Sequence, residues 1–159
     1  MAKSLAVYFS ATGSTETVSQ KIAVATSSDL FEIIPEVPYT KSDLDWSNPL
    51  SRTSKEKNDP SYRPEISSKV KKLDSYDTIY LGFPIYWYRE PAIIDTFLTS
   101  YDFSGKKIYP FCTSGSSLMG NTPVLLQALV PNAKVGNGKG FLPSVKEEEI
   151  MEWLDGLKK

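Results

Sequence analysis

Short apolar runs alternate with stretches of helical periodicity along most of the chain. Strand-like runs rich in β-branched and aromatic residues lie at 5–9, 29–34, 78–83 and 107–112. Apolar residues recur at helical spacing at 16–25, 91–98, 123–129 and 144–157, where Ser144 and Glu147 form a capping-box pattern. This alternation predicts an α/β fold, a parallel sheet with helices on both faces.

Two further elements are less regular. Val135 to Leu142 predicts a short fifth strand although glycines interrupt it, and Ile66, Val70 and Leu73 predict a helix with a basic outer face. The length of 159 residues, with 40% hydrophobic content, suits one core. We therefore expect one domain over residues 1–159, a doubly wound five-stranded sheet in the order 2-1-3-4-5.

Composition excludes several classes of function. The chain has 18 Lys and Arg against 19 Asp and Glu, a net charge of -1, so we expect neither nucleic acid nor an anionic membrane as partner. It has no histidine, which removes Ser-His and Cys-His nucleophile pairs and histidine metal sites. The single cysteine, Cys112, and the lack of a long apolar run favour a cytoplasmic protein. We expect it to be a monomer.

The loop after the first strand predicts an anion site. In an open parallel sheet in this order, ligands bind at the carboxyl ends of the first, third and fourth strands. Four hydroxyl residues surround a glycine that allows close backbone approach ahead of a helix: Ser10, Thr12, Gly13, Ser14 and Thr15. The loop has no Lys or Arg, which favours a single phosphate monoester over a magnesium-bound triphosphate. An ordinary capped helix start is the alternative.

The loop after the third strand is aromatic. Tyr86, Trp87 and Tyr88 follow Pro84 and Ile85, and alternate packing cannot bury all three rings. A planar aromatic ligand stacked on one or two of them would explain their presence. Packing on the next helix, or contact with a partner protein, is the alternative.

The loop after the fourth strand is rich in glycine and hydroxyl residues. Its glycines at 115 and 120 have P-loop spacing, but Asn121 stands where the lysine is required, which argues against triphosphate hydrolysis. Cys112 precedes the loop as in a cysteine phosphatase, yet Leu118 occupies the arginine position, so we interpret the thiol as an inert core group. The remaining interpretation is a loop that covers the polar edge of a ring.

These three loops resemble those of flavodoxins. The segment 10–15 resembles the family's phosphate loop, and Gly82 to Trp87 with Pro91 is similar to its flavin-ring loop. The resemblance implies that FMN is the cofactor and that Trp87 is the best candidate to stack on the ring. It also implies that the phosphate lies at the first loop and the pyrimidine side of the ring at Thr113, Ser114, Gly115, Ser116 and Gly120.

The resemblance implies a one-electron carrier that shuttles electrons between redox partner proteins, a flavoprotein reductase and an acceptor. An NAD(P)H-dependent FMN quinone or flavin reductase on the same fold is the alternative, so the sequence leaves open whether the protein is an enzyme. A flavin-free interaction domain is a third possibility. The long polar stretch from Tyr39 to Arg63 could carry Trp46 or Arg52 toward the flavin, or pack on the sheet edge.

Overall fold

A computed structural model describes residues 3–10, 13–45, 47–59, 61–85, 90–113, 122–142 and 144–157. All of its strands belong to one parallel sheet: β1 (Ser4–Tyr8), β2 (Asp29–Glu32), β3 (Thr78–Pro84), β4 (Lys107–Thr113), β5 (Lys134–Val135) and β6 (Lys139–Phe141). The order β2-β1-β3-β4-β5 confirms the predicted winding, and β6 is an extra strand that pairs with β4. The winding direction reverses between β1 and β3.

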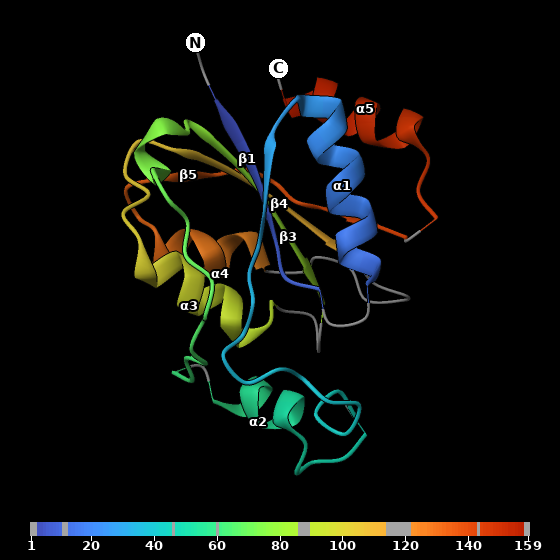
Figure 1. Cartoon of the computed structure of the whole chain (residues 1–159), viewed down its shortest axis with the longest axis vertical. Helices are drawn as coiled ribbons and strands as arrows, with labels where there is room; N and C mark the ends of the chain where they lie inside the picture. Colours follow the sequence, from blue (N-terminus) through green and yellow to red (C-terminus); the bar gives the residue numbers. More distant parts are fainter. Residues whose placement is uncertain are drawn as a thin grey trace.

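Helices cover both faces of this sheet (Figure 1). The pair α1 (Ser14–Thr26) and α5 (Glu147–Leu157) lies on one face, and the pair α3 (Ala92–Ser100) and α4 (Thr122–Leu129) lies on the other. A short helix α2 (Arg52–Asn58) lies beyond the carboxyl edge of the sheet, and a 3₁₀ turn η1 (Leu73–Ser75) precedes β3. Within the described ranges, no helix has the length and apolar character needed to cross a membrane.

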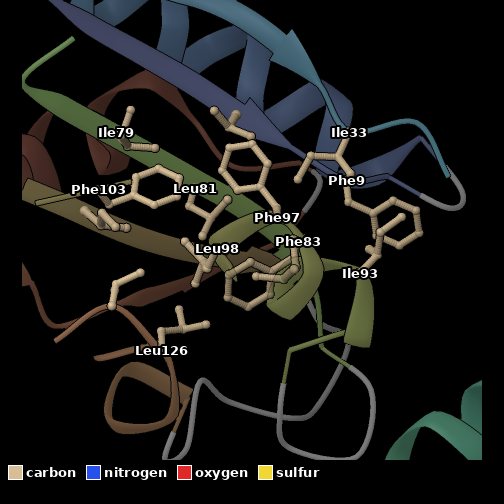
Figure 2. Packing of buried hydrophobic residues seen from close by; sticks show 14 of the residues in the cluster. Phe9, Ile33, Ile79, Leu81, Phe83, Ile93, Phe97, Leu98, Phe103 and Leu126 are labelled. Carbon is tan, nitrogen blue, oxygen red and sulfur yellow. The ribbon is translucent and has the colours of Figure 1, made fainter. Parts of the chain in front are cut away.

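Alternating side chains of the strands form a separate core on each face. Figure 2 shows the larger core, in which Ile79, Leu81 and Phe83 of β3 lie against Phe97 and Leu98 of α3. The intervening positions face the other way, toward α1 and α5. The second core contains Val18, Ile22, Phe111, Phe141, Val145, Ile150 and Leu154. Because successive side chains of β3 point to opposite faces of the sheet, this one strand packs against both helical layers.

The predicted fifth strand is divided into β5 and β6, and Pro110 explains the division. The carbonyl of Ile108 accepts a hydrogen bond from Gly136 N–H at 2.9 Å, so the backbone groups of alternate β4 residues face this edge. Pro110 is the next residue with that orientation, and it has no N–H to donate. The ladder therefore stops after Val135 and resumes at Lys139, opposite Phe111.

Two local predictions are wrong. Residues 66–70 form no helix: Ile66 bridges Pro35 in antiparallel fashion, and Ser68 Oγ accepts from Ile34 N–H at 2.9 Å. Serine hydroxyls that bond a neighbouring backbone compete with the helical ladder. The capping box is also absent, because α5 begins at Glu147 and Ser144 lies in a preceding turn.

Candidate functional site

The ends of β1, β3 and β4 lie side by side at one edge of the sheet. Tyr8 pairs with Gly82 at the end of β1, and Pro84 pairs with Thr113 at the end of β4. Each of these strands runs into one of the loops singled out by the sequence. The start of α1 lies at the same edge (Figure 1). The predicted convergence of the loops therefore follows directly from the strand register.

The first loop turns into α1 at a glycine in the left-handed region. Gly13 has φ 94° and ψ -14°, and its N–H donates to Ser10 Oγ at 3.0 Å. Its carbonyl accepts from Thr17 N–H at 3.1 Å, which begins the helical ladder. A residue with a Cβ is strained at this φ, so the turn requires glycine.

Within the described residues, the first N–H groups of α1 have no side-chain cap. The residue at the cap position is Gly13, which offers no side-chain acceptor. The N–H groups of Ser14, Thr15 and Glu16 point out of the helix start and have no intrahelical acceptor. The helix dipole adds partial positive charge at the same place, so this helix start can bind an anion.

Thr113 connects all three loops. Its hydroxyl lies 2.7 Å from the Thr15 hydroxyl of the first loop, and both side chains are buried. Its carbonyl accepts from the N–H of Ile85, at the start of the second loop, at 3.2 Å. Thr113 also ends β4 and so leads into the third loop. The sequence predicted Thr113 at the ring, but the structure turns its hydroxyl toward the first loop.

Thr122, which opens α4, was not among the residues predicted to bind the ligand. Its side chain is fully buried, and within the described ranges its hydroxyl has no hydrogen-bond partner. An orphaned buried hydroxyl is rare, because burial without a partner is costly. The signal in the sequence is the Thr122-Pro123 pair, a common way to begin a helix.

The stretch from Tyr39 to Arg63 packs beside the first loop through Tyr39. The ring of Tyr39 lies 5.3 Å from that of Phe9, the residue before Ser10. The guanidinium of Arg52 lies 3.8 Å over the Tyr39 ring, and the Tyr39 hydroxyl donates to the buried Glu56 carboxylate. The Arg52 side chain therefore packs against Tyr39.

The far end of this stretch is held by α3. Arg63 Nη1 lies 3.8 Å from the buried carboxylate of Asp95. The segment is therefore attached at both ends, to Phe9 through Tyr39 and to α3 through Arg63. It forms a wall beyond the carboxyl edge of the sheet, at the bottom of the view in Figure 1.

Two titratable groups near the strand ends remain neutral at physiological pH. Burial, with the charges of Glu32 and Glu16, raises the pKa of Tyr8 to about 12. Burial raises the pKa of the Cys112 thiol to about 11. The interpretation of Cys112 as a core thiol is confirmed, since a neutral buried thiol is a poor nucleophile.

Several predicted ligand residues lie outside the described residues. The structure brings together Ser10, Gly13, Ser14, Thr15, Pro84, Ile85 and Thr113. The predicted positions without a structural description are Thr12, Tyr86, Trp87, Tyr88, Ser114, Gly115, Ser116 and Gly120, and Trp46 of the polar stretch. The roles proposed for them, ring stacking above all, stay predictions.

The described part of the site offers a helix start without a side-chain cap, beside the ends of β3 and β4. A sequence model described as flavodoxin matches residues 3–157 of the chain. The chain belongs to the flavodoxin family. The strand order and the position of the site agree with that membership, since flavodoxins bind their ligand at the switch point between the first and third strands.

The similarity of this flavodoxin to solved structures covers all or nearly all of the chain. A protein of Bacteroides eggerthii DSM 20697 assigned as a flavoprotein is 40% identical, with a TM-score of 0.94 over 100% of this chain and 99% of its own. Another, from Bacteroides uniformis ATCC 8492, is 42% identical, with a TM-score of 0.92 over 97% and 98%.

A flavoprotein of Lactobacillus acidophilus NCFM in complex with FMN is 19% identical, with a TM-score of 0.72 over 97% of this chain and 99% of its own. At that identity the likeness concerns the fold alone. No curated protein matches the chain.

Proposed function

We propose that this flavodoxin binds FMN without a covalent bond and carries single electrons between redox partner proteins. The observation that carries the proposal is the uncapped start of α1 behind Gly13, at the edge where the loops after β1, β3 and β4 meet. Membership of the flavodoxin family supports FMN as the ligand.

The residues present fit an FMN phosphate. The N–H groups of Ser14, Thr15 and Glu16 would donate to its oxygens, because no side chain of the described residues caps them. Ser10 holds the turn by accepting from Gly13 N–H, and it keeps its own hydroxyl proton for the phosphate. The helix dipole supplies positive charge that the loop's side chains lack, which suits one terminal phosphate.

The flavin ring would lie between the second and third loops. Ile85 is held to Thr113 by a backbone hydrogen bond of 3.2 Å, so the two loops start from a fixed spacing. The buried hydroxyl of Thr122 at the start of α4 is a donor at the far end of the third loop. FMN supplies reversible one-electron chemistry when bound. The protein positions the ring and limits the approach of water.

The wall formed by the stretch from Tyr39 to Arg63 supports a carrier over a reductase. It is anchored at Phe9 by Tyr39 and at Asp95 by Arg63, beside the proposed ring site. Hydride transfer needs a nicotinamide stacked about 3–3.5 Å from the flavin, which requires one open face. If this wall covers one face of the flavin ring and ring-stacking residues cover the other, only the edge of the ring is exposed. An exposed edge suffices for electron transfer to a partner protein.

Spectroscopy of the purified protein tests the proposal. We expect a yellow protein that releases FMN, and not FAD, on denaturation. Reduction by NADPH alone should be slow, and a flavoprotein reductase added in catalytic amount should make it fast. A colourless protein that binds no added FMN would contradict the cofactor assignment. Rapid bleaching of the flavin by NADPH without a reductase, in stopped flow, would favour the reductase function over the carrier function.

A further inference from the structure

We propose that Thr113 is a positioning residue for the FMN phosphate, acting through the hydroxyl of Thr15. The inference rests on the proposed FMN site, and it gives a residue at the end of β4 an effect on the other end of the ligand. Thr113 and Thr15 are 98 positions apart in the chain, and their hydroxyl oxygens lie 2.7 Å apart.

Burial makes this contact a defined one. Thr15 is 1% exposed and Thr113 is 5% exposed, so water does not compete freely for either hydroxyl. Both partners are short β-branched side chains with few rotamers. Thr15 lies in the first turn of α1, and Ser19 Oγ donates to its carbonyl at 2.7 Å, which fixes the backbone that carries it.

The number of hydroxyl protons determines which of the two threonines donates to the other. Two hydroxyls share one hydrogen bond, so one of their two protons is left to donate elsewhere. A phosphate monoester above its second pKa of about 6 only accepts hydrogen bonds. With FMN bound, the Thr15 proton therefore goes to the phosphate, and Thr113 donates to Thr15. A donor whose own oxygen accepts a hydrogen bond is polarised and binds the anion more tightly.

The test compares FMN with riboflavin, which lacks the phosphate. The full-length chain is stripped of flavin, and both affinities are measured for the wild type, Thr113→Val, Thr113→Ser, Thr15→Val and the Thr15→Val/Thr113→Val double variant. Thr26→Val is the matched control, because Thr26 Oγ1 bonds the Ile22 carbonyl at the opposite end of the same helix. Melting curves report folding, and Thr113→Ala replaces Thr113→Val if the valine variant does not fold.

We expect Thr15→Val to weaken FMN binding about tenfold or more, the effect of one charge-assisted hydrogen bond. Thr113→Val should weaken it about fivefold, leave riboflavin binding within about twofold, and shift the phosphorus resonance of bound FMN. Thr113→Ser should restore FMN binding, and the double variant should resemble Thr15→Val. Thr26→Val should change neither affinity.

Three outcomes would overturn the inference. Equal losses of FMN and riboflavin in Thr113→Val would make Thr113 a ring contact. Additive losses in the double variant would mean that the two hydroxyls act separately. No loss in either single variant would leave the phosphate to the backbone N–H groups alone. Failure of the wild type to bind FMN is a different result, since it would contradict the proposed function before any variant is compared.

Discussion

The ring of Phe111 fills the space that a side chain on Gly82 would need. A Cβ built on Gly82 would lie 2.3 Å from Phe111 Cζ, across the β3–β4 pair. Phe111 is fully buried in the core beneath α1 and α5, so its ring has little room to move.

Gly82→Ala should therefore destabilise the fold by about 1–3 kcal/mol, the usual cost of overpacking a core. Gly140→Ala is the control, because a Cβ at this β6 position would meet only Cys112 Sγ, at 3.4 Å. Urea unfolding measures both. Equal stabilities of the two variants would mean that Phe111 can move aside without cost.

The left-handed turn at Gly13 predicts an effect on both folding and cofactor binding. Gly13→Ala should cost about 1–2 kcal/mol, the penalty for a side chain in the left-handed region, and should weaken FMN binding. Gly105→Ala carries the same strain at φ 77°, in a turn before β4 and away from the site, so it should lower stability and leave FMN affinity intact.

A third glycine, Gly156, serves as a control in which replacement by alanine introduces no left-handed strain. Gly156 lies in α5 with open space where a Cβ would be, so Gly156→Ala should stabilise the protein by about 0.5–1 kcal/mol. Thermal unfolding and FMN titration are measured on all three variants. Loss of FMN affinity in Gly105→Ala would show that lower stability alone weakens binding.

Glu56 should make stability depend on pH. Burial raises the pKa of this carboxyl above its ordinary value of 4.5, although the Tyr39 hydroxyl and Arg52 oppose the shift. The folded state therefore holds its proton more tightly than the unfolded state. The stabilising contribution is complete below pH 4.5 and is lost as the pH rises through the raised value.

Relative to Glu56→Gln, the wild type should thus lose stability as the pH rises from about 4.5 through the raised pKa of Glu56. Asp59→Asn supplies a control of opposite sign, since hydrogen bonds from Ser61 lower the Asp59 pKa from 3.8. Its wild-type contribution is present above 3.8 and is lost as the pH falls through the lowered value. Chemical unfolding at a series of pH values, from well below 3.8 upward, measures both differences, and a flat profile for Glu56 would contradict the burial argument.

Cys112 should be unreactive in the folded protein. Its thiol is fully buried, and its pKa of about 11 leaves almost no thiolate at pH 8. Iodoacetamide should alkylate it slowly in buffer and rapidly in concentrated urea, with the mass increase measured over time. Fast alkylation of the native protein would indicate that β4 opens readily.

The strands β1, β3 and β4 were predictable because most of their residues are buried, so that each reads as a largely apolar run. The run at 78–83 became β3, and its neighbours followed from the winding rule for parallel sheets. The position of the ligand loops followed in turn, since they begin where those strands end. The first motif also contained Gly13, whose positive φ is what such a loop requires.

Contacts between distant segments were not predictable from a single sequence. The apolar spacing of Ile66 and Val70 resembles a helix, yet both side chains pack on the main core from an irregular segment beside β2. The hydrogen bond between the hydroxyls of Thr113 and Thr15 depends on the register of the sheet and on where α1 begins, which local patterns do not specify. Pro110, by contrast, interrupts the edge through a local property, its missing N–H.

That interruption has a consequence for how copies of this protein meet in a crowded solution. An exposed sheet edge with a long unpaired backbone invites another molecule to add a strand and begin an aggregate. Here one edge consists of β5 and β6, two and three residues long, out of step because of Pro110 and flanked by Lys134 and Lys139. At the opposite edge, the Ser67 N–H donates to the Ile34 carbonyl, and the Ser68 hydroxyl accepts from the Ile34 N–H. A proline in one strand and two serines in a loop thus shorten the stretches of backbone to which another molecule could add a strand.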